Sequence, residues 1–101
     1  MAKFLFWEKI VLDSEADFFV EMRAFEVPKS AGFPDCVKYS LVLVCGEGCI
    51  LRYDNEQGKG HHRHCNGKES KIEFGSIEDL LKYFFAEADE IRRKLKKGVL
   101  K

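Results

Sequence analysis

The residues best suited to chemistry lie within one short segment, 53–65. It contains all three histidines of the chain and a lysine, Lys59, between two glycines. His62 and His64 are two residues apart, so in an extended backbone both side chains point to one face and Arg63 points to the other. In a loop, any arrangement is open. The glycines allow a ligand to approach the backbone closely, and Lys59 can meet a phosphate as a point charge.

Two imidazoles beside a basic side chain provide what RNA cleavage without a metal requires. One histidine accepts the proton of the ribose 2′-hydroxyl, and the other donates a proton to the leaving 5′-oxygen. An Arg or Lys stabilises the charge that builds on the phosphorus centre. Histidine suits both roles because its ordinary pKa of about 6.5 leaves both protonation states available near neutral pH. A histidine-rich segment can equally be a solvated surface, so the residue types alone leave the function open.

A metal site is an alternative use of the same residues. His62, His64 and Cys65, joined by His61, Asp54 or another cysteine, could hold zinc. The spacing matches no common structural zinc pattern, because the chain has no Cys-x-x-Cys. The Gly-Lys-Gly sequence lacks the leading glycine and the following Ser or Thr of a phosphate-binding P-loop. We therefore expect neither a metal nor a cofactor.

A recognisable pattern runs along the chain in 7–11, 20–23, 27–28, 38–41 and above all in the motif Tyr53-Asp54-Asn55-x-x-Gly58-Lys59-Gly60-x-His62-Arg63-His64. In these residues the chain resembles the TumE family of toxin–antitoxin toxins. The resemblance implies a toxin of a type II pair that cleaves or otherwise disables cellular RNA, and a DNA-binding antitoxin protein that neutralises it. The family motif has an acidic residue where this chain has His61. If that carboxylate orients a histidine or binds a metal, the site here is weakened.

The residue types and the resemblance together give a site hypothesis. His62 and His64 form the acid–base pair, while Arg63 and Lys59 bind the phosphate and Asp54 contributes to the same site. The substrate contacts around them are expected from Tyr53, Asn55, Gly58, Gly60 and His61. Two other functions remain open. One is a module that binds a partner protein or RNA through this segment without cleaving it, and the other is a metal-dependent hydrolase that uses His and Cys ligands.

The composition is that of one small domain spanning residues 1–101. The net charge is zero, so no overall field attracts nucleic acid, and polyanion binding requires a local patch. No apolar run is long enough to span a membrane, and charge follows too soon after the first residue for a signal peptide. We therefore expect a cytoplasmic protein that does not bind membranes. Its four cysteines are expected to be reduced, with a Cys45–Cys49 bridge across a hairpin as the alternative.

Hydrophobic periodicity predicts an α+β fold, in which one long C-terminal amphipathic helix packs on a bent, meander-like antiparallel sheet of about five strands. The expected strands are 4–12, 18–27, 37–45, 49–54 and 71–74. The polar stretch 55–70 is expected to be a loop, and the third strand to be covered on both faces. The helix is expected to begin after a capping Ser76 and to end at Gly98. Trp7 and the phenylalanines are expected in the core, although Phe85 could support a homodimer.

Overall fold

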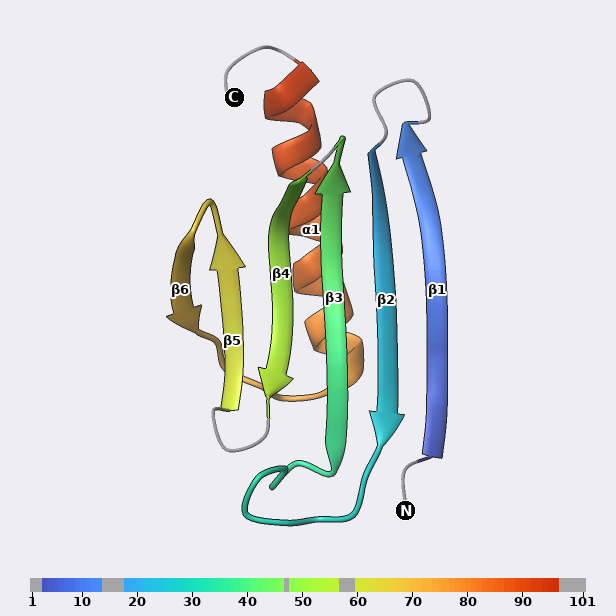
Figure 1. Ribbon diagram of the computed structural model, residues 1–101, viewed down its shortest axis with the longest axis vertical. Helices are drawn as coiled ribbons and strands as arrows, with labels where there is room; N and C mark the ends of the chain where they lie inside the picture. The colour runs from blue at the N-terminus through green and yellow to red at the C-terminus, as the bar shows by residue number, and fades with distance from the viewer. Residues whose placement is uncertain (1–2, 14–17, 47, 57–59, 97–101) are drawn as a thin grey trace.

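The computed structural model describes residues 3–13, 18–46, 48–56 and 60–96. Within these residues the chain forms six strands and one helix: β1 (Lys3–Asp13), β2 (Phe18–Glu26), β3 (Val37–Cys45), β4 (Gly48–Glu56), β5 (Gly60–Cys65), β6 (Lys68–Lys71) and α1 (Ile77–Lys96). Each strand pairs antiparallel with the next, so the sheet order is β1-β2-β3-β4-β5-β6 (Figure 1). The α+β class, the meander and the C-terminal helix are confirmed, with six described strands where about five were expected.

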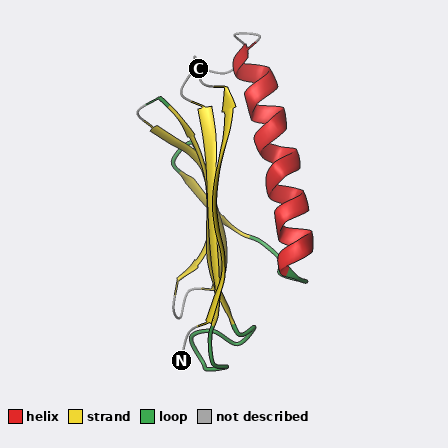
Figure 2. Ribbon diagram, turned by 90° about the vertical axis from the view of Figure 1, so that its right-hand side faces the viewer, coloured by secondary structure: helices red, strands yellow, loops and turns green. Residues whose placement is uncertain are grey.

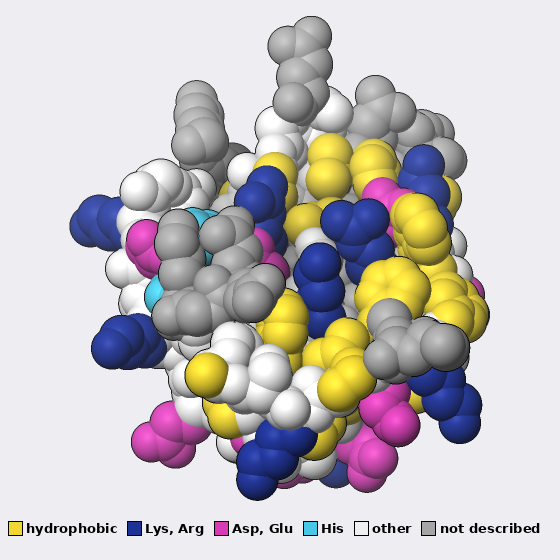
Figure 3. Space-filling view, turned by 60° about the horizontal axis from the view of Figure 1, so that its bottom comes forward, with side chains coloured by type: hydrophobic (Ala, Val, Ile, Leu, Met, Phe, Trp, Pro, Cys, Tyr) yellow, Lys and Arg dark blue, Asp and Glu magenta, His cyan; other side chains and the backbone are white. Residues whose placement is uncertain are grey.

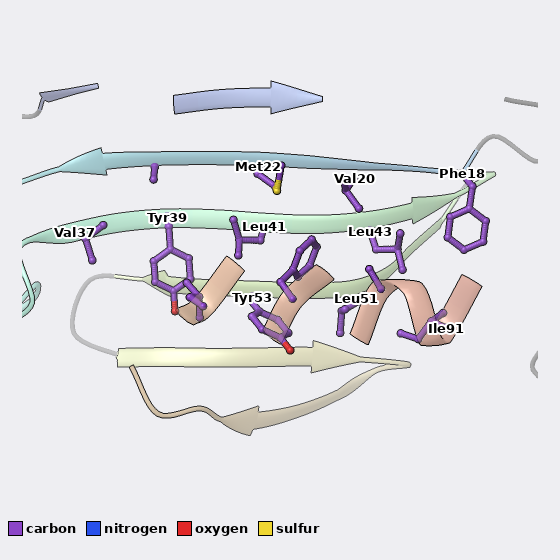
Figure 4. Packing of buried hydrophobic residues seen from close by; sticks show 14 residues of the cluster. Phe18, Val20, Met22, Val37, Tyr39, Leu41, Leu43, Leu51, Tyr53 and Ile91 are labelled. Carbon is purple, nitrogen blue, oxygen red and sulfur yellow. The ribbon is translucent and has the colours of Figure 1, made fainter. Parts of the chain in front are cut away.

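One face of the sheet is buried because side chains alternate along each strand. In β2, Val20, Met22 and Ala24 are buried while Arg23 is exposed, as the alternation predicts. Helix α1 runs along this buried face (Figure 2). The core between them is formed by apolar side chains of β2, β3, β4 and α1 (Figure 4): Phe18, Val20, Met22, Ala24, Val37, Tyr39, Leu41, Leu43, Leu51, Tyr53, Leu80, Phe84, Ala88 and Ile91.

Helix α1 begins where the sequence predicts, because Ser76 caps it. The Ser76 hydroxyl oxygen accepts a hydrogen bond from the Asp79 amide at 3.1 Å, and the Ser76 carbonyl accepts one from the Leu80 amide at 3.0 Å. Glu78 and Asp79 carry negative charge in the first turn, where the helix dipole stabilises it. The expected end at Gly98 lies outside the described residues. No helix in the described part of the chain is long and apolar enough to cross a membrane.

Residues 55–70 depart most from the predicted secondary structure. The sequence predicts a loop, but the structure has a hairpin made of β5 and β6. Its turn is Asn66-Gly67, and both residues have positive φ, 51° and 79°, as a type I′ hairpin turn requires. The last strand is Lys68–Lys71 rather than the predicted 71–74. The polar composition of these strands conceals the hairpin, whereas the Asn-Gly pair is its sequence signal.

Replacing Gly67 by alanine tests this turn. Its φ of 79° strains any residue that has a Cβ, although an added Cβ would meet nothing within 4 Å. We expect Gly67→Ala to lower the free energy of unfolding by about 1 kcal/mol in urea denaturation. Gly48→Ala is the matched control, because Gly48 also has open space around it but no positive φ. Equal losses in the two variants would contradict the strain explanation.

The face of the sheet opposite α1, here called the open face, is covered by no other part of the described chain (Figure 2). Trp7 is 54% exposed and Phe4 57% exposed, so the prediction that these two lie in the core is wrong. The third strand, β3, is covered on one face only: Leu41 and Leu43 are buried, whereas Val42 between them is half-buried. Apolar residues on both sides of β3 therefore do not mean two covered faces.

The structure contains no disulfide among the four cysteines, all of which lie in its described residues. The β3–β4 register pairs Cys45 with Gly48 and Val44 with Cys49, after an irregularity that follows Leu43. The two thiols on either side of the turn are therefore not directly opposite each other. The alternative of a Cys45–Cys49 bridge is not realised.

Candidate active site

Most of the candidate residues lie on β4 and β5, whose antiparallel register decides which side chains share a face. Arg52 pairs with His64, and Asp54 pairs with His62. Directly paired residues point to the same face of a sheet, so these four side chains lie together on the open face. Arg63, between the two histidines, points toward α1. The shared face expected for His62 and His64 in an extended backbone is therefore present.

The two histidines converge on one carboxylate oxygen. The Nε2 atoms of His62 and His64 lie 3.6 and 3.9 Å from Oε1 of Glu69, which β6 places beside them. His64 Nε2 also lies 3.8 Å from Oδ1 of Asp54, whose Oδ2 is 3.8 Å from Nη1 of Arg52. The two imidazole ring centroids are 6.4 Å apart. An anion can therefore lie within reach of both imidazoles at once.

The His62 ring is oriented by a hydrogen bond within its own strand. Its Nδ1 lies 2.9 Å from the carbonyl oxygen of Gly60, and a carbonyl can only accept, so Nδ1 carries the hydrogen. In the neutral ring, Nε2 is then the nitrogen without a hydrogen, and it faces Glu69. Gly60 has a φ of 78°, which glycine adopts without strain. The His62 side chain is 12% exposed and that of His64 is 40% exposed, so His64 is the more accessible of the two.

Arg63 joins the hairpin to α1 on the other face. Its Nε lies 3.0 and 2.8 Å from the two carboxylate oxygens of Glu87, and its Nη2 donates to the same group. The Tyr53 hydroxyl also donates to Glu87. The hydrogen bond with Glu87 raises the pKa of Arg63. Burial would raise the pKa of Glu87, but the hydrogen bonds from Arg63 and Tyr53 outweigh it and hold that pKa below its usual range.

The hydrogen bonds of Glu87 with Arg63 and Tyr53 should stabilise the fold at neutral pH and lose this effect at acidic pH. A carboxyl group whose pKa is lowered by folding stabilises the fold above its unfolded-state pKa, and that stabilisation is lost as the pH falls through the folded-state pKa. We expect wild type to exceed Glu87→Gln in free energy of unfolding at pH 7, and the difference to shrink below the ordinary pKa of 4.5. Urea denaturation at each pH measures it. Glu90→Gln, at a side chain 58% exposed on α1, is the control. A Glu87→Gln difference that is constant with pH would contradict the expectation.

The side chains of His61 and Asn55 also lie on the side of the sheet that faces α1. His61 Nδ1 lies 2.9 Å from the Tyr39 hydroxyl, its Nε2 lies 2.8 Å from Oδ2 of Asp35, and its ring stacks on Phe74 with centroids 4.5 Å apart. Asn55 accepts a hydrogen bond from the Tyr39 amide at 2.9 Å and donates to another β3 carbonyl at 2.7 Å. Its side chain thus continues the pairing of the β3 backbone beyond Ser40↔Asp54, the last β3–β4 pair.

The predicted site residues are thus divided between the two faces. The open face carries Asp54, His62 and His64. The opposite side carries Tyr53, Asn55, His61 and Arg63. Gly60 supplies the carbonyl that orients His62, while Gly58 and Lys59 lie outside the described residues. Because His61 faces Tyr39 and Asp35, its presence in place of an acidic residue removes no carboxylate from the open face.

Three open-face residues near the histidines, Arg52, Glu69 and Lys71, were not predicted as site residues. Arg52 could have been found from the alternation of β4, which puts it on the same face as Asp54. The other two follow from the Asn-Gly turn, since pairing outward from it sets Glu69 opposite His64 and Lys71 opposite His62. Among the described residues, no group of three or more His, Cys, Asp or Glu side chains is placed to hold a metal ion.

An open antiparallel meander with one helix behind it, and with histidines and carboxylates on its uncovered face, defines a small α+β protein whose candidate site is on the sheet itself. The family model described as Toxin TumE matches residues 2–93, and the chain belongs to this family. Membership gives the chain the role of a toxin, with an antitoxin as its general partner and a type II toxin–antitoxin pair as its context. Neither a curated protein nor a solved structure matches the chain.

Proposed function

We propose that this toxin is an endoribonuclease that cleaves cellular RNA in the cytoplasm by acid–base catalysis with His62 and His64, without a metal. The observation that supports the proposal is the convergence of both Nε2 atoms on one carboxylate oxygen of Glu69. A phosphodiester also presents anionic oxygen acceptors, so it can occupy the same position between the imidazoles. Glu69 is 52% exposed on the short edge strand β6, where it is free to turn aside for such a ligand.

The proposed reaction is an intramolecular transfer at phosphorus. One imidazole accepts the proton of the ribose 2′-hydroxyl as that oxygen attacks the phosphorus atom. The bond from phosphorus to the 5′-oxygen breaks, and this oxygen receives a proton from the other, protonated imidazole. The products are a 2′,3′-cyclic phosphate on one fragment and a 5′-hydroxyl on the other. A ring separation of 6.4 Å lets each imidazole reach a different oxygen of one phosphodiester.

The charge that builds on the phosphate is stabilised by cations of the open face. Arg52 lies directly opposite His64, and Lys71 lies directly opposite His62. Lys59 remains a further candidate. Because the guanidinium of Arg63 is bound to Glu87 on the other face, Arg63 acts as a positioning residue that holds β5 against α1 and so fixes the two histidines. The antitoxin would be a DNA-binding protein that blocks this face.

Induced expression in cells tests the proposal, with growth and total-RNA integrity as the readouts. Wild type is expected to stop growth and to fragment RNA, and His62→Ala/His64→Ala to do neither while retaining the wild-type circular dichroism spectrum. Growth arrest with intact RNA would overturn the proposed nuclease activity and favour a module that binds a partner without cleaving it. Fragmentation by the folded double variant would place the chemistry elsewhere.

A further inference from the structure

The open face carries one continuous row of side chains that crosses all six described strands. Successive register pairs place them side by side, and the row reads Trp7, Arg23, Ser40, Asp54, His62, Lys71. Neighbouring strands are about 4.8 Å apart, so the row runs roughly 19 Å from the tryptophan to His62. A linear ligand lying across the strands would therefore meet the histidines at one end and the tryptophan at the other.

A hollow follows this row over β1 to β4. It has a volume of about 460 Å³, and its lining includes the basic residues Arg23, Lys38 and Arg52. A smaller hollow of about 190 Å³ adjoins it at Arg23 and Lys38. Figure 3 shows Lys and Arg side chains grouped in the middle of this face beside hydrophobic ones. The neutral net charge of the whole chain therefore conceals a local basic patch.

The acidic residues of the hollow already have partners. Glu21 accepts a hydrogen bond from the indole Nε1 of Trp7 at 2.8 Å, and Asp54 lies near Arg52 and His64. Lys38 has no such carboxylate beside it in the described contacts and is exposed. Among the described contacts, Arg23 and Lys38 are thus the basic groups of the hollow without a carboxylate partner, while Arg52 shares its charge with Asp54 and is 46% exposed.

Trp7 is held in place while about half of it stays exposed. The indole is fixed by its hydrogen bond to Glu21, and the guanidinium of Arg23 lies 5.5 Å from the ring centroid. A large aromatic side chain that is fixed and exposed, beside cations, is the combination that binds single-stranded nucleic acid, in which bases stack on the ring and phosphates meet the cations. A duplex keeps its bases stacked on each other and cannot use the ring in this way.

We propose that the open face binds single-stranded RNA across the strands, with the phosphate to be cleaved at His62 and His64, neighbouring phosphates at Arg52, Arg23 and Lys38, and a base stacked on Trp7. This inference rests on the proposed nuclease function for the position of the cleaved phosphate. It assigns substrate binding to β1, β2 and β3, outside the segment 53–65 that the sequence singles out.

Binding of an RNA that cannot be cleaved tests the proposal with the full chain. The probe is a fluorescein-labelled octanucleotide with 2′-O-methyl ribose at every position, which removes the attacking hydroxyl. Anisotropy is expected to show binding that Trp7→Ala weakens by about 5- to 150-fold. Trp7 is also the only tryptophan of the chain, so its fluorescence should be quenched by the RNA. Arg23→Ala/Lys38→Ala should lower the magnitude of the salt slope of log K by about 1.4.

Two exposed residues of α1, on the far side of the sheet, provide the controls: Tyr83→Ala for Trp7→Ala, and Lys82→Ala for the basic variants. Both controls should bind the probe as wild type does. The proposal is overturned if wild type does not bind, if Trp7→Ala binds within twofold of wild type, or if an RNA duplex of equal length binds as tightly as the single strand.

Binding and cleavage measured together also distinguish failure of this proposal from failure of the proposed nuclease function. Binding of the 2′-O-methyl probe that depends on Trp7, with no cleavage of ordinary RNA, would overturn the nuclease function and support the binding surface. Cleavage that depends on His62 and His64, with binding that does not depend on Trp7, would support the nuclease function and overturn the binding surface.

Discussion

His62→Ala and His64→Ala are each expected to lower the rate of RNA cleavage by purified protein by about 10²- to 10⁴-fold. That range is the usual contribution of one positioned general acid or base. Both imidazoles face the open side of the sheet with Nε2 near the same carboxylate oxygen, and neither packs in the core. Removal of the more exposed His64 should therefore leave the free energy of unfolding within about 1 kcal/mol of wild type. His62→Ala should lower it by about 1–2 kcal/mol, because this side chain is 12% exposed and hydrogen-bonded to the Gly60 carbonyl. Single-turnover cleavage of a labelled oligonucleotide, with urea denaturation of each variant, measures both effects.

The third histidine supplies a matched control within the same strand. His61 points to the opposite face, where it meets Tyr39 and Asp35. His61→Ala is expected to lower stability but to keep the cleavage rate of the folded protein within a few-fold of wild type. A rate loss in His61→Ala as large as in His62→Ala, at full folding, would contradict the assignment of the site to the open face.

Arg63→Ala is expected to lower the free energy of unfolding by about 1–3 kcal/mol. The variant leaves the Glu87 carboxylate, 22% exposed, with the Tyr53 hydroxyl as its remaining partner in this cluster, and an uncompensated, partly buried charge carries a cost of that size. The partial exposure of both groups keeps the effect below that of a fully buried pair. Arg63→Ala/Glu87→Ala should therefore lose less than the sum of the two single variants, which a double-mutant cycle in urea measures.

The same variants separate a positioning role for Arg63 from direct contact with phosphate. If Arg63 acts only by holding β5 against α1, Arg63→Ala should cleave at a rate within about tenfold of wild type under conditions where it is fully folded. An undiminished stability together with a rate loss of more than 10²-fold would mean that Arg63 leaves Glu87 and binds the phosphate, as the residue types and the family resemblance first suggest.

The strands with one buried face could be predicted from the sequence because their alternation is regular. Val20, Met22 and Ala24 mark the side that faces the helix, and Ser76 marks the start of α1. The β5–β6 hairpin could not be read from hydrophobic pattern, since its residues are polar or half-buried on both faces. Its pairing is set by the turn geometry of Asn66-Gly67, which periodicity does not report.

The candidate site was only partly predictable for the same reason. The shared face of His62 and His64 follows from their spacing once the backbone is known to be extended. The contact of Arg63 with Glu87 could not be predicted, because the two residues are 24 positions apart and meet only through the packing of α1. The exposure of Trp7 could not be predicted from the sequence either, since a tryptophan in a β-branched and aromatic strand is usually part of a core.

The chemistry of the product ends distinguishes acid–base catalysis by the two histidines from cleavage that depends on a metal. Purified wild type is incubated with a defined RNA in EDTA, and the fragment ends are identified by mass spectrometry. Acid–base catalysis by the two histidines should give 2′,3′-cyclic phosphate and 5′-hydroxyl ends, formed without added metal and absent with His62→Ala/His64→Ala. Fragments that form only with a divalent metal, fragments that carry 3′-hydroxyl and 5′-phosphate ends, or intact RNA would each contradict acid–base catalysis by the two histidines.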